Sequence, residues 1–392
     1  MVRLKLSYVA GASIVALALV TGSVANACDI NIGAVGPLSG GAAQWGQAIK
    51  GAAEFVAAEA NKAGGLEVGG QRCKLNVIAI DSKYTAEGAA AAANNFITQN
   101  IKFIIGPIGS PEVTGMKPVA TRNKMLMMSD SYAKDAIGPK WPLTFHVGPG
   151  PLAWGDPIVK LAKQKFNIKK VLTIAPNDQA GTDTAEAAIA MYKKNGVEAS
   201  PEYYQRGTTN FAPIVTRIMN ANPDVVDTVS TPPGDAGILV KQLRQADFKG
   251  VIGRLGGPGT EEIYRIAGGK DVVKNFYWFE PVYLDENVKK VGESYRELIG
   301  APPPENNFFY IFVAGGRAML KAITEAGTAD DAEKVAVVLR KMKVEDPNLG
   351  KGIWIGQEAY GINQELSLPF GVGMLIDGKD QPLVRVEAPD GK

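Results

Sequence analysis

The chain has 392 residues, of which 46% are hydrophobic and 21% are charged, with 42 Lys and Arg against 40 Asp and Glu. This length exceeds the size at which a single hydrophobic core stops growing, so we expect two domains or one large one. One His and two Cys exclude most zinc, haem and iron–sulfur sites, and the balanced charge argues against a nucleic-acid partner.

Residues 1–27 have the pattern of an export signal. Arg3 and Lys5 precede an apolar run at 9–20, and an A-x-A motif at 25–27 closes the segment. This order is typical of a cleaved signal peptide, and the apolar run is short for a membrane span. We therefore expect a soluble mature protein exported to the periplasm. An uncleaved anchor is the alternative.

The two cysteines open two predicted strands, at 28–35 and 73–80. If these are neighbouring parallel strands, Cys28 and Cys73 lie side by side, within reach of a disulfide. An oxidising compartment favours that bond. The alternative is a lipid on Cys28 as the first mature residue, but the residues before it match a lipobox poorly. We favour the disulfide.

From the first strand onward, short apolar strands alternate with helical patterns, which is typical of βαβ units and parallel sheets. A first run has strands at 29–36, 73–80, 101–106, 124–129 and 144–147, with helices at 44–63, 86–99 and 111–122 between them. A second run has strands at 169–176, 197–205, 224–230, 250–255 and 275–282, with helices at 152–166, 182–195, 212–221, 236–246 and 260–267. Helices at 287–298, 306–326 and 330–343 follow, and the tail from 352 is strand-like. We infer a bilobed α/β protein.

Small polar residues and glycines follow several predicted strands. Ligands of open α/β sheets collect at the carboxyl ends of strands, so two such ends facing each other make one cleft. Ser110, followed by a proline, opens a helix whose free backbone N–H groups can hold a carboxylate; a plain helix cap is the alternative. Trp45 can form an apolar wall or pack in the core. Similar polar strand ends are Ser129-Asp130-Ser131-Tyr132, Asn177-Asp178-Gln179, Ser230-Thr231 and Gly256-Gly257-Pro258-Gly259.

The sequence gives little support to an enzyme. It contains no GxxxxGK[ST], HExxH, CxxC or GxSxG motif, and the only histidine is His146 at a predicted strand end. We interpret His146 as a hinge or surface residue. An exported hydrolase that uses it is the distant alternative.

The chain resembles the extracytoplasmic solute-binding proteins of ABC transporters, in the branched-chain amino-acid binding group. The resemblance covers nearly the whole mature chain and lies in INIGAVGPLSGGAAQWGQAIKGAAEF, the Asp81-Ser82 strand end, IIGPIGS, KMLMMSDSYA, TFHV, the Asp178 loop, NANPDVV and LVKQLRQADFKG. It implies a type I periplasmic-binding fold of two lobes, with crossovers near 146–149, 278–282 and 350–355. It also implies that the first two strands are parallel neighbours.

The expected organisation is a signal peptide at 1–27, lobe one at 28–146 and 280–350, and lobe two at 147–279 and 351–392. The resemblance implies a non-enzymatic monomer without cofactor or metal that passes its ligand to an inner-membrane ABC permease. A ligand sensor on the same fold is an alternative.

Departures from the family pattern bear on the ligand. Members that bind α-amino acids resemble one another in a Thr that falls here at Ala133, a Tyr that falls at Ala180, and an acid in the loop at Gly259. Glu261 and Glu262 come one or two positions late. Because an unpaired ammonium in a dry cleft costs several kcal/mol, we expect an aromatic or other hydrophobic organic acid. A branched-chain amino acid is the alternative, with Glu261 supplying the charge.

The expected ligand site has residues from both lobes, with Ser110 on the carboxylate. Trp45, Tyr132 and Trp154 are expected to form a flat apolar slot. The full predicted set is Trp45, Ser110, Ser131 and Tyr132 in lobe one, and Trp154, Asp178, Gln179, Ser230 and Gly257 in lobe two.

Overall fold

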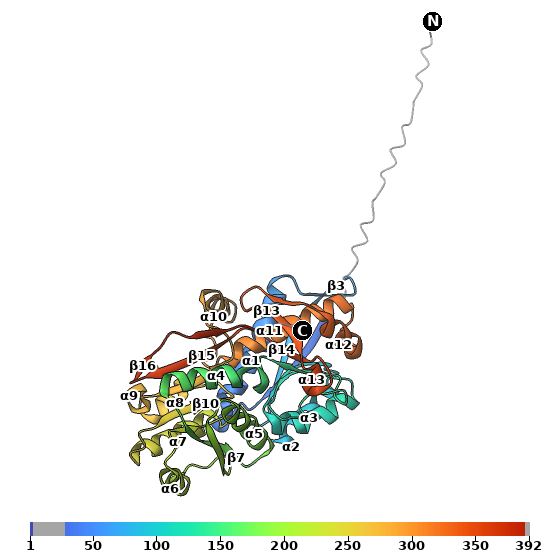
Figure 1. The fold of residues 1–392 in the computed structure, drawn as a ribbon. Coiled ribbons are helices and arrows are strands. Elements are labelled where there is room, and N and C mark those ends of the chain that lie inside the picture. The colour runs from blue at the N-terminus through green and yellow to red at the C-terminus, as the bar shows by residue number, and fades with distance from the viewer. Residues whose placement is uncertain (3–27, 389–392) are drawn as a thin grey trace.

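The computed structural model describes residues 1–2 and 28–388. These residues form two α/β lobes, seen at the upper right and lower left of Figure 1, each built on its own sheet. The expected two-lobe fold is therefore confirmed. Nearly all of the expected signal segment lies outside the described residues.

Lobe one is built on a sheet to which nine of the described strands belong, in the order β12-β13-β14-β6-β5-β4-β1-β3-β2. Its strands are β1 (Cys28–Gly36), β2 (Leu66–Val68), β3 (Gln71–Asp81), β4 (Phe103–Ile108), β5 (Leu126–Asp130), β6 (Thr144–Val147), β12 (Val344–Asp346), β13 (Gly350–Ile355) and β14 (Glu365–Ser367). β1 runs parallel to both β3 and β4, which brings their carboxyl ends to one edge. Ser110 follows β4 at this edge, Ser131 and Tyr132 follow β5, and Trp45 lies in the helix after β1.

The disulfide expected from the strand register is confirmed. Cys28 lies opposite Cys73 in the parallel β1–β3 pair, and the two residues are bonded with their Cα atoms 4.4 Å apart. The bond joins the amino ends of these strands, at the end of the sheet away from the cleft.

Lobe two is built on a sheet of eight described strands, in the order β16-β15-β11-β10-β9-β7-β8 with β17 paired to β15. Its strands are β7 (Lys170–Pro176), β8 (Glu198–Tyr204), β9 (Val225–Asp227), β10 (Val251–Arg254), β11 (Phe276–Glu280), β15 (Phe370–Ile376), β16 (Lys379–Asp380) and β17 (Val384–Val386). β7 to β11 are parallel to one another, whereas β15 pairs antiparallel with β11.

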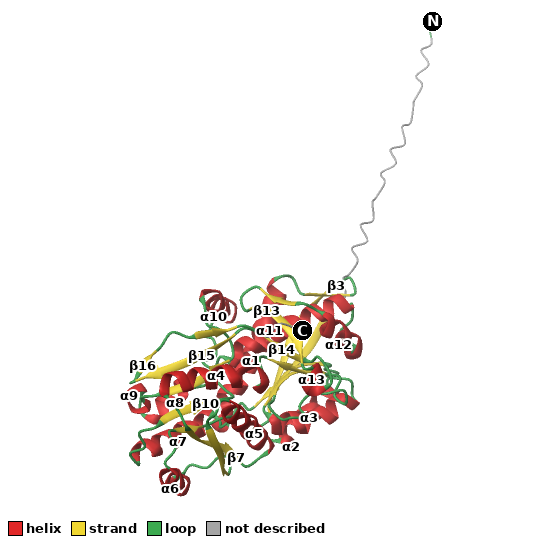
Figure 2. Ribbon diagram, in the orientation of Figure 1, coloured by secondary structure: helices red, strands yellow, loops and turns green. Residues whose placement is uncertain are grey.

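Helices cover both faces of each sheet (Figure 2). They are η1 (Gly40–Ala42), α1 (Ala43–Lys62), α2 (Ala86–Thr98), α3 (Ser110–Arg122), α4 (Pro151–Phe166), α5 (Gln179–Lys194), α6 (Ala212–Ala221), α7 (Pro233–Gln245), α8 (Thr260–Ala267), α9 (Lys270–Val273), α10 (Glu286–Ile299), α11 (Phe308–Ala326), α12 (Ala332–Lys341) and α13 (Gln357–Tyr360). In β1, Ala34 packs in the cluster of α1 and α11, while Val35 packs in that of α2. Successive strand residues point to opposite faces, so one apolar strand needs a helix layer on each side.

The chain passes between the lobes three times, and the last crossing differs from expectation. The first crossing follows β6 and the second follows β11. The third was expected at 350–355, but β13 and β14 both pair in the sheet of lobe one. The chain therefore crosses between Ser367 and Phe370. The second segment of lobe two begins after this crossing, later than the expected start at residue 351. A strand-like pattern does not reveal which sheet a strand will join, and this explains the error.

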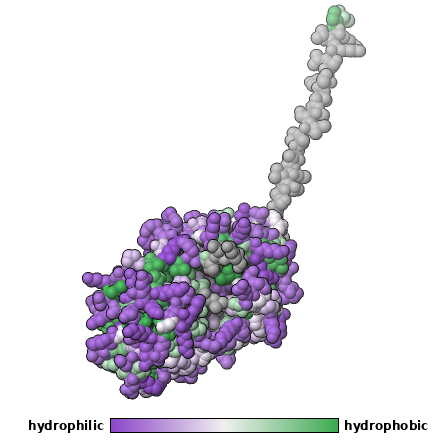
Figure 3. All heavy atoms as spheres, viewed as in Figure 1, coloured by the Kyte–Doolittle hydropathy of each residue, from purple (hydrophilic) through white to green (hydrophobic). Residues whose placement is uncertain are grey.

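Within the described part of the chain, none of the helices is long and apolar enough to cross a membrane. Hydrophilic side chains cover most of the face in Figure 3, with smaller hydrophobic areas between them.

Candidate functional site

A small cavity lies where the strand ends of the two lobes meet. About 290 Å³ around it is free of protein atoms, open solvent included, but a water-sized sphere can reach only about 20 Å³, so the cavity must widen to admit a ligand. Its lining comes from both lobes and comprises Trp45, Tyr84, Ile108, Gly109, Ser110, Asp130, Ser131, Tyr132, Ala180, Thr184, Ser230, Gly256 and Phe308. We call it the cleft cavity.

The turn from β4 into α3 forms one wall of the cleft cavity. Gly109 takes a positive φ of 89° at the start of α3, and a Cβ there would lie 2.2 Å from the Tyr84 hydroxyl oxygen. Glycine therefore lets the ring of Tyr84 approach the helix start. The Ser131 hydroxyl donates to Ser110 Oγ at 3.0 Å, which fixes both hydroxyls at the cavity.

Four aromatic side chains line the cavity, those of Trp45, Tyr84, Tyr132 and Phe308, and the Trp45 ring contacts two of the others. The Trp45 ring centroid lies 5.6 Å from that of Tyr84 and 6.2 Å from that of Phe308. Tyr132 lies two residues after the end of β5 and packs edge-on against Trp154, with the ring centroids 5.6 Å apart. This lining suits a flat apolar ligand.

Several buried polar atoms of the lining have no hydrogen-bond partner among the described residues. They are Trp45 Nε1, Tyr132 Oη, Ser230 Oγ and Asp130 Oδ2. Buried polar groups without partners are rare, because each costs about 1–3 kcal/mol. Three of these four atoms can donate, so a ligand with acceptor oxygens would satisfy them.

The charges around the cavity are unevenly balanced. Arg254 is fully buried behind the loop of Gly256 and Gly257, and burial lowers its pKa only to about 10, so it stays charged at neutral pH. Burial, and then the nearby Glu365, raise the pKa of Asp130 well above its usual value. Burial likewise raises the pKa of Glu112, which lies in the first turn of α3. These shifts favour the neutral forms of Asp130 and Glu112. Asp227, a buried carboxyl whose pKa burial raises only to about 6, opposes the charge of Arg254 in part.

The two lobes are in contact around the cavity. Thr114 Oγ1 of lobe one donates to Gln179 Oε1 of lobe two at 3.0 Å, and Gln179 Nε2 donates to Asp135 Oδ1 at 3.0 Å. Lys134 adds an ion pair with Glu186 at 2.6 Å. The structure is a closed form of the cleft.

The structure brings five of the nine predicted ligand residues into the cavity lining: Trp45, Ser110, Ser131, Tyr132 and Ser230. Ser110 opens α3 and is 1% exposed. Their contacts with a ligand stay a prediction.

The other four predicted residues lie outside the lining. Trp154 packs in the core of lobe two behind Tyr132. Asp178 caps α5 by accepting from Gly181 N and pairs with Arg206 at 2.7 Å. Gln179 forms a hydrogen bond between the lobes. Gly257 does not line the cavity, whereas Gly256, the residue before it, does. The predicted start of α5, at 182, was too late. The side chains of Asp178 and Gln179 were therefore expected to be free in a loop.

Sequence reasoning missed Tyr84, Asp130, Thr184, Gly256 and Phe308. Asp130 and Gly256 lie within the polar strand ends at 129–132 and 256–259, so the sequence pattern does contain a signal for both. Phe308 begins α11, more than 200 positions from Trp45 in the chain, and local pattern gives no signal for it.

The departures from the amino-acid-binding pattern fall as follows. Ala180 lines the cavity, whereas Ala133 packs on Val113. Glu262 lies 3.6 Å from Arg265 in its own helix, and Glu261 faces a separate hollow. Within the described residues, neither of these two glutamates lines the cavity.

His146 is 2% exposed, so the surface alternative for it is wrong. Its Nδ1 lies 3.1 Å from Gly148 O and its Nε2 3.6 Å from Asp130 Oδ2, at the first crossing between the lobes. Burial lowers its pKa to about 4. The neighbouring Ser129 donates its hydroxyl to Phe145 O rather than to the imidazole.

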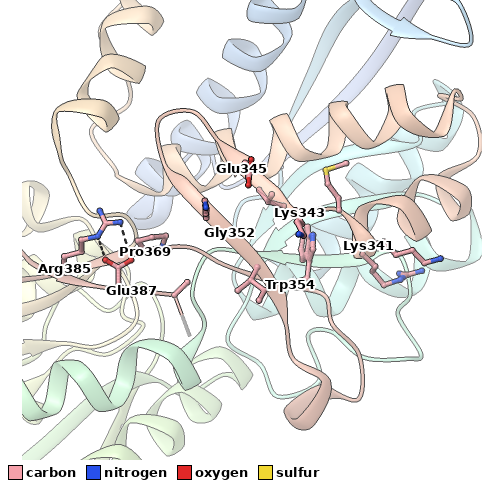
Figure 4. A pocket seen from close by; sticks show the side chains of 14 residues that line it. Lys341, Lys343, Glu345, Gly352, Trp354, Pro369, Arg385 and Glu387 are labelled. Atoms are coloured by element: carbon pink, nitrogen blue, oxygen red, sulfur yellow. Dashed lines mark hydrogen bonds and ion pairs between the residues drawn. The ribbon is translucent and has the colours of Figure 1, made fainter. Parts of the chain in front are cut away.

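A larger and more open groove lies elsewhere, and Figure 4 shows it. It lies between β13 and the chain after β17, with Lys343 and Trp354 on one side and the paired Arg385 and Glu387 on the other. It shares no described lining residue with the cleft cavity.

Comparisons with known proteins agree on one family. The periplasmic binding protein family matches residues 29–364. A Leu/Ile/Val-binding protein of Rhizobium johnstonii is 26% identical over 343 residues, 87% of this chain and 91% of that protein.

Two solved structures show the same fold. A leucine-binding protein of Thermotoga maritima superposes with a TM-score of 0.77 at 21% identity, covering 92% of this chain and 99% of that one. An ABC-transporter solute-binding protein of R. palustris in complex with 4-hydroxybenzoate superposes with a TM-score of 0.75 at 20% identity, covering 92% and 98%.

Proposed function

The chain belongs to the periplasmic binding protein family, as a solute-binding protein of an ABC transport system, and we propose that its ligand is a small hydrophobic or aromatic carboxylate without an α-amino group. The ligand would lie in the cleft cavity, and the closed lobes would cover it. Delivery to an inner-membrane permease completes this function. The protein would act without catalysis.

One observation carries the choice of ligand: the unpartnered polar atoms of the lining are mainly donors. Trp45 Nε1 can only donate, and the hydroxyls of Tyr132 and Ser230 can donate as well. A carboxylate accepts several such bonds, and charge-assisted bonds are about twice as strong as neutral ones. The aromatic walls of Trp45, Tyr84 and Phe308 would hold the apolar part.

Electrostatics supports an anion over a zwitterion. Burial favours the neutral form of Asp130, which then offers no negative charge to an α-ammonium. An α-ammonium would need an ionised acid near it, and neither Glu261 nor Glu262 lines the cavity in the described structure. The ammonium would therefore lose its hydration without full compensation.

A second candidate, a branched-chain amino acid, also has support. Asp130 Oδ2 faces the cavity without a partner among the described residues, so an ammonium that ionised this carboxyl would be paired. The relative from Rhizobium johnstonii is a Leu/Ile/Val-binding protein, whereas the R. palustris structure holds 4-hydroxybenzoate. Relatives thus offer both chemistries.

A thermal-shift screen tests the proposal. Ligand-stripped mature protein is heated with benzoate, 4-hydroxybenzoate, aliphatic acids, and the amino acids leucine, valine and phenylalanine. A ligand at a hundred times its Kd adds about 2.7 kcal/mol of stability, so the acids are expected to raise Tm by several degrees. A rise with the amino acids alone would refute the proposed ligand class.

A sensor on the same fold would bind the same ligand. The identity of the neighbouring genes separates the two roles, because a transport protein is expected beside a permease and an ATPase. A regulator gene in their place would favour the sensor.

A further inference from the structure

A second hollow lies at the hinge, where the walls come from both lobes and from the second crossing. A water-sized sphere can reach about 240 Å³ of it. Lobe one contributes Gln44, Glu305 and Asn307, and the crossing contributes Leu284. Lobe two contributes the remaining lining residues: Gly259, Thr260, Glu261, Tyr264, Lys270, Trp278, Glu280, Asp380, Gln381 and Leu383. We call it the hinge hollow; α8, α9 and β16 border it at the left of Figure 1.

Two deeply buried polar atoms of the hinge hollow lack partners within the described chain. Glu280 is 3% exposed and Tyr264 is 4% exposed. Glu280 Oε1 and Tyr264 Oη make no hydrogen bond of standard geometry, although the Asn307 side chain lies close to the Glu280 carboxyl. The other Glu280 oxygen accepts from Trp278 Nε1 at 3.2 Å, which fixes the carboxyl. A buried carboxyl oxygen and hydroxyl left open in one hollow indicate a missing polar partner.

The hinge hollow also carries an excess of negative charge. Glu261, Glu305 and Asp380 line it against a single ammonium, that of Lys270, which pairs with Asp380 at 2.6 Å. Burial raises the pKa of the fourth acid, Glu280, to about 7, so it is partly protonated at neutral pH, and a nearby ammonium would favour its ionised form. Burial and then three of these carboxylates, those of Asp380, Glu261 and Glu280, raise the pKa of Tyr264. The partner that the hollow lacks is therefore a cation.

Aromatic rings define what kind of cation fits. Tyr264 and Trp278 line the hollow, and Lys270 Nζ already lies 5.2 Å from the Tyr264 ring centroid. The faces of aromatic rings attract organic cations. An extended organic cation can also pair with several carboxylates that lie apart from one another. Within the described residues there is no cluster of three or more acidic, His or Cys side chains suited to a metal ion.

We propose that the hinge hollow binds a small organic cation with one or two ammonium groups, paired with Glu280 and Glu261 and hydrogen-bonded by Tyr264. This site is separate from the cleft cavity and does not depend on which ligand the cleft takes. Because Glu305 and Gln44 come from the other lobe, the cation stabilises the closed form.

Calorimetric titration of the ligand-stripped mature protein with 1,4-diaminobutane, at constant ionic strength, tests the proposal. Most of the lining belongs to lobe two, so binding is expected without a cleft ligand. 1,4-Butanediol has the same skeleton without charge, and added NaCl reports bulk screening. The variants are Glu280→Gln and Tyr264→Phe, with Glu87→Gln, an exposed acid on α2, as the matched control.

We expect saturable binding of the diamine that is about tenfold weaker in Glu280→Gln and a few-fold weaker in Tyr264→Phe, while Glu87→Gln behaves as the unchanged protein. If Glu280→Gln does not fold, diamine binding by Tyr264→Phe decides whether the proposal holds, because that substitution removes only one oxygen atom. Absence of saturable binding, equal heat from the diol or NaCl, or unchanged binding by the variants would overturn the proposal. None of these results bears on the cleft ligand.

Discussion

Thr114 of lobe one donates a 3.0 Å hydrogen bond to Gln179 of lobe two, across the mouth of the cleft. The same Gln179 amide donates to Asp135 at 3.0 Å, so one side chain at the start of α5 makes two bonds to the opposite lobe. Bonds that exist only in the closed form bias the lobes toward closure, and a ligand's apparent affinity includes that bias.

We therefore predict that Gln179→Ala weakens ligand binding although Gln179 does not line the cavity. Loss of two neutral hydrogen bonds should cost about 1–2 kcal/mol of closure, or roughly a fivefold to thirtyfold rise in Kd. Calorimetry with the cleft ligand measures it, and Gln99→Ala, at an exposed position after α2, serves as the control. An unchanged Kd would show that these contacts do not stabilise the bound state.

Asp130 separates the two ligand classes by its response to pH. Its pKa is raised by burial and by the nearby Glu365, and the neighbouring His146 has a lowered pKa and is neutral. A carboxylate ligand should bind more weakly as pH rises through the pKa of Asp130, because the ionised acid repels it. Asp130→Asn should flatten that dependence and keep affinity within a few-fold. Loss of binding in this variant would instead indicate a ligand with an ammonium group.

The buried Glu365 makes stability depend on pH. It accepts from Gly150 N at 3.0 Å, at the first crossing, and burial raises its pKa to about 7. An unfolded Glu ionises near pH 4.3, so the folded state holds an extra proton between that pH and about 7. The free energy of unfolding should therefore fall as pH rises through this window, by up to about 3 kcal/mol.

Urea unfolding at pH 5 and pH 8 measures this effect. Glu365→Gln keeps the acceptor oxygen without the ionisation, so its stability should fall less than that of the unchanged protein between the two values. Equal losses in both proteins would contradict the role given to Glu365.

The Cys28–Cys73 bond closes a loop with a sequence separation of 45. A loop of this size should contribute about 2–4 kcal/mol to the free energy of unfolding. We predict a loss of that order in the double variant Cys28→Ser, Cys73→Ser. The bond lies at the amino ends of β1 and β3, away from the cleft, so ligand affinity should not change. Wild type under reducing conditions should match the variant, and a large change in Kd would contradict this account.

The fold could be predicted from the sequence to a large extent, because the alternation of apolar strands and amphipathic helices is local. The pairing of Cys28 with Cys73 also followed from two strand starts. By contrast, the assignment of β13 and β14 to lobe one depends on sheet pairing over more than 200 positions, as between Glu365 and His146. Pattern alone does not contain that information.

The candidate site could be predicted in part for the same reason. Ser110 and Ser131 follow strands of lobe one and Ser230 follows a strand of lobe two. Residues at the carboxyl ends of the parallel strands of each sheet meet where the two sheets face each other. Phe308 enters the cavity from a late helix. Asp178 and Gln179 also lie at a strand end, but their side chains bond to Arg206 and Thr114 and do not line the cavity. The reason is that the helix begins three residues earlier than expected.

The most direct test of the ligand class compares molecules that differ only in the α-ammonium. Calorimetry on the ligand-stripped protein can pair 4-methylpentanoate with leucine and 3-phenylpropanoate with phenylalanine. In each pair we predict that the acid binds at least about tenfold more tightly, a difference of about 1.4 kcal/mol, because the cleft cavity offers donors to the carboxylate and disfavours an ammonium. Tighter binding of leucine or phenylalanine than of its matched acid would contradict the proposed ligand class.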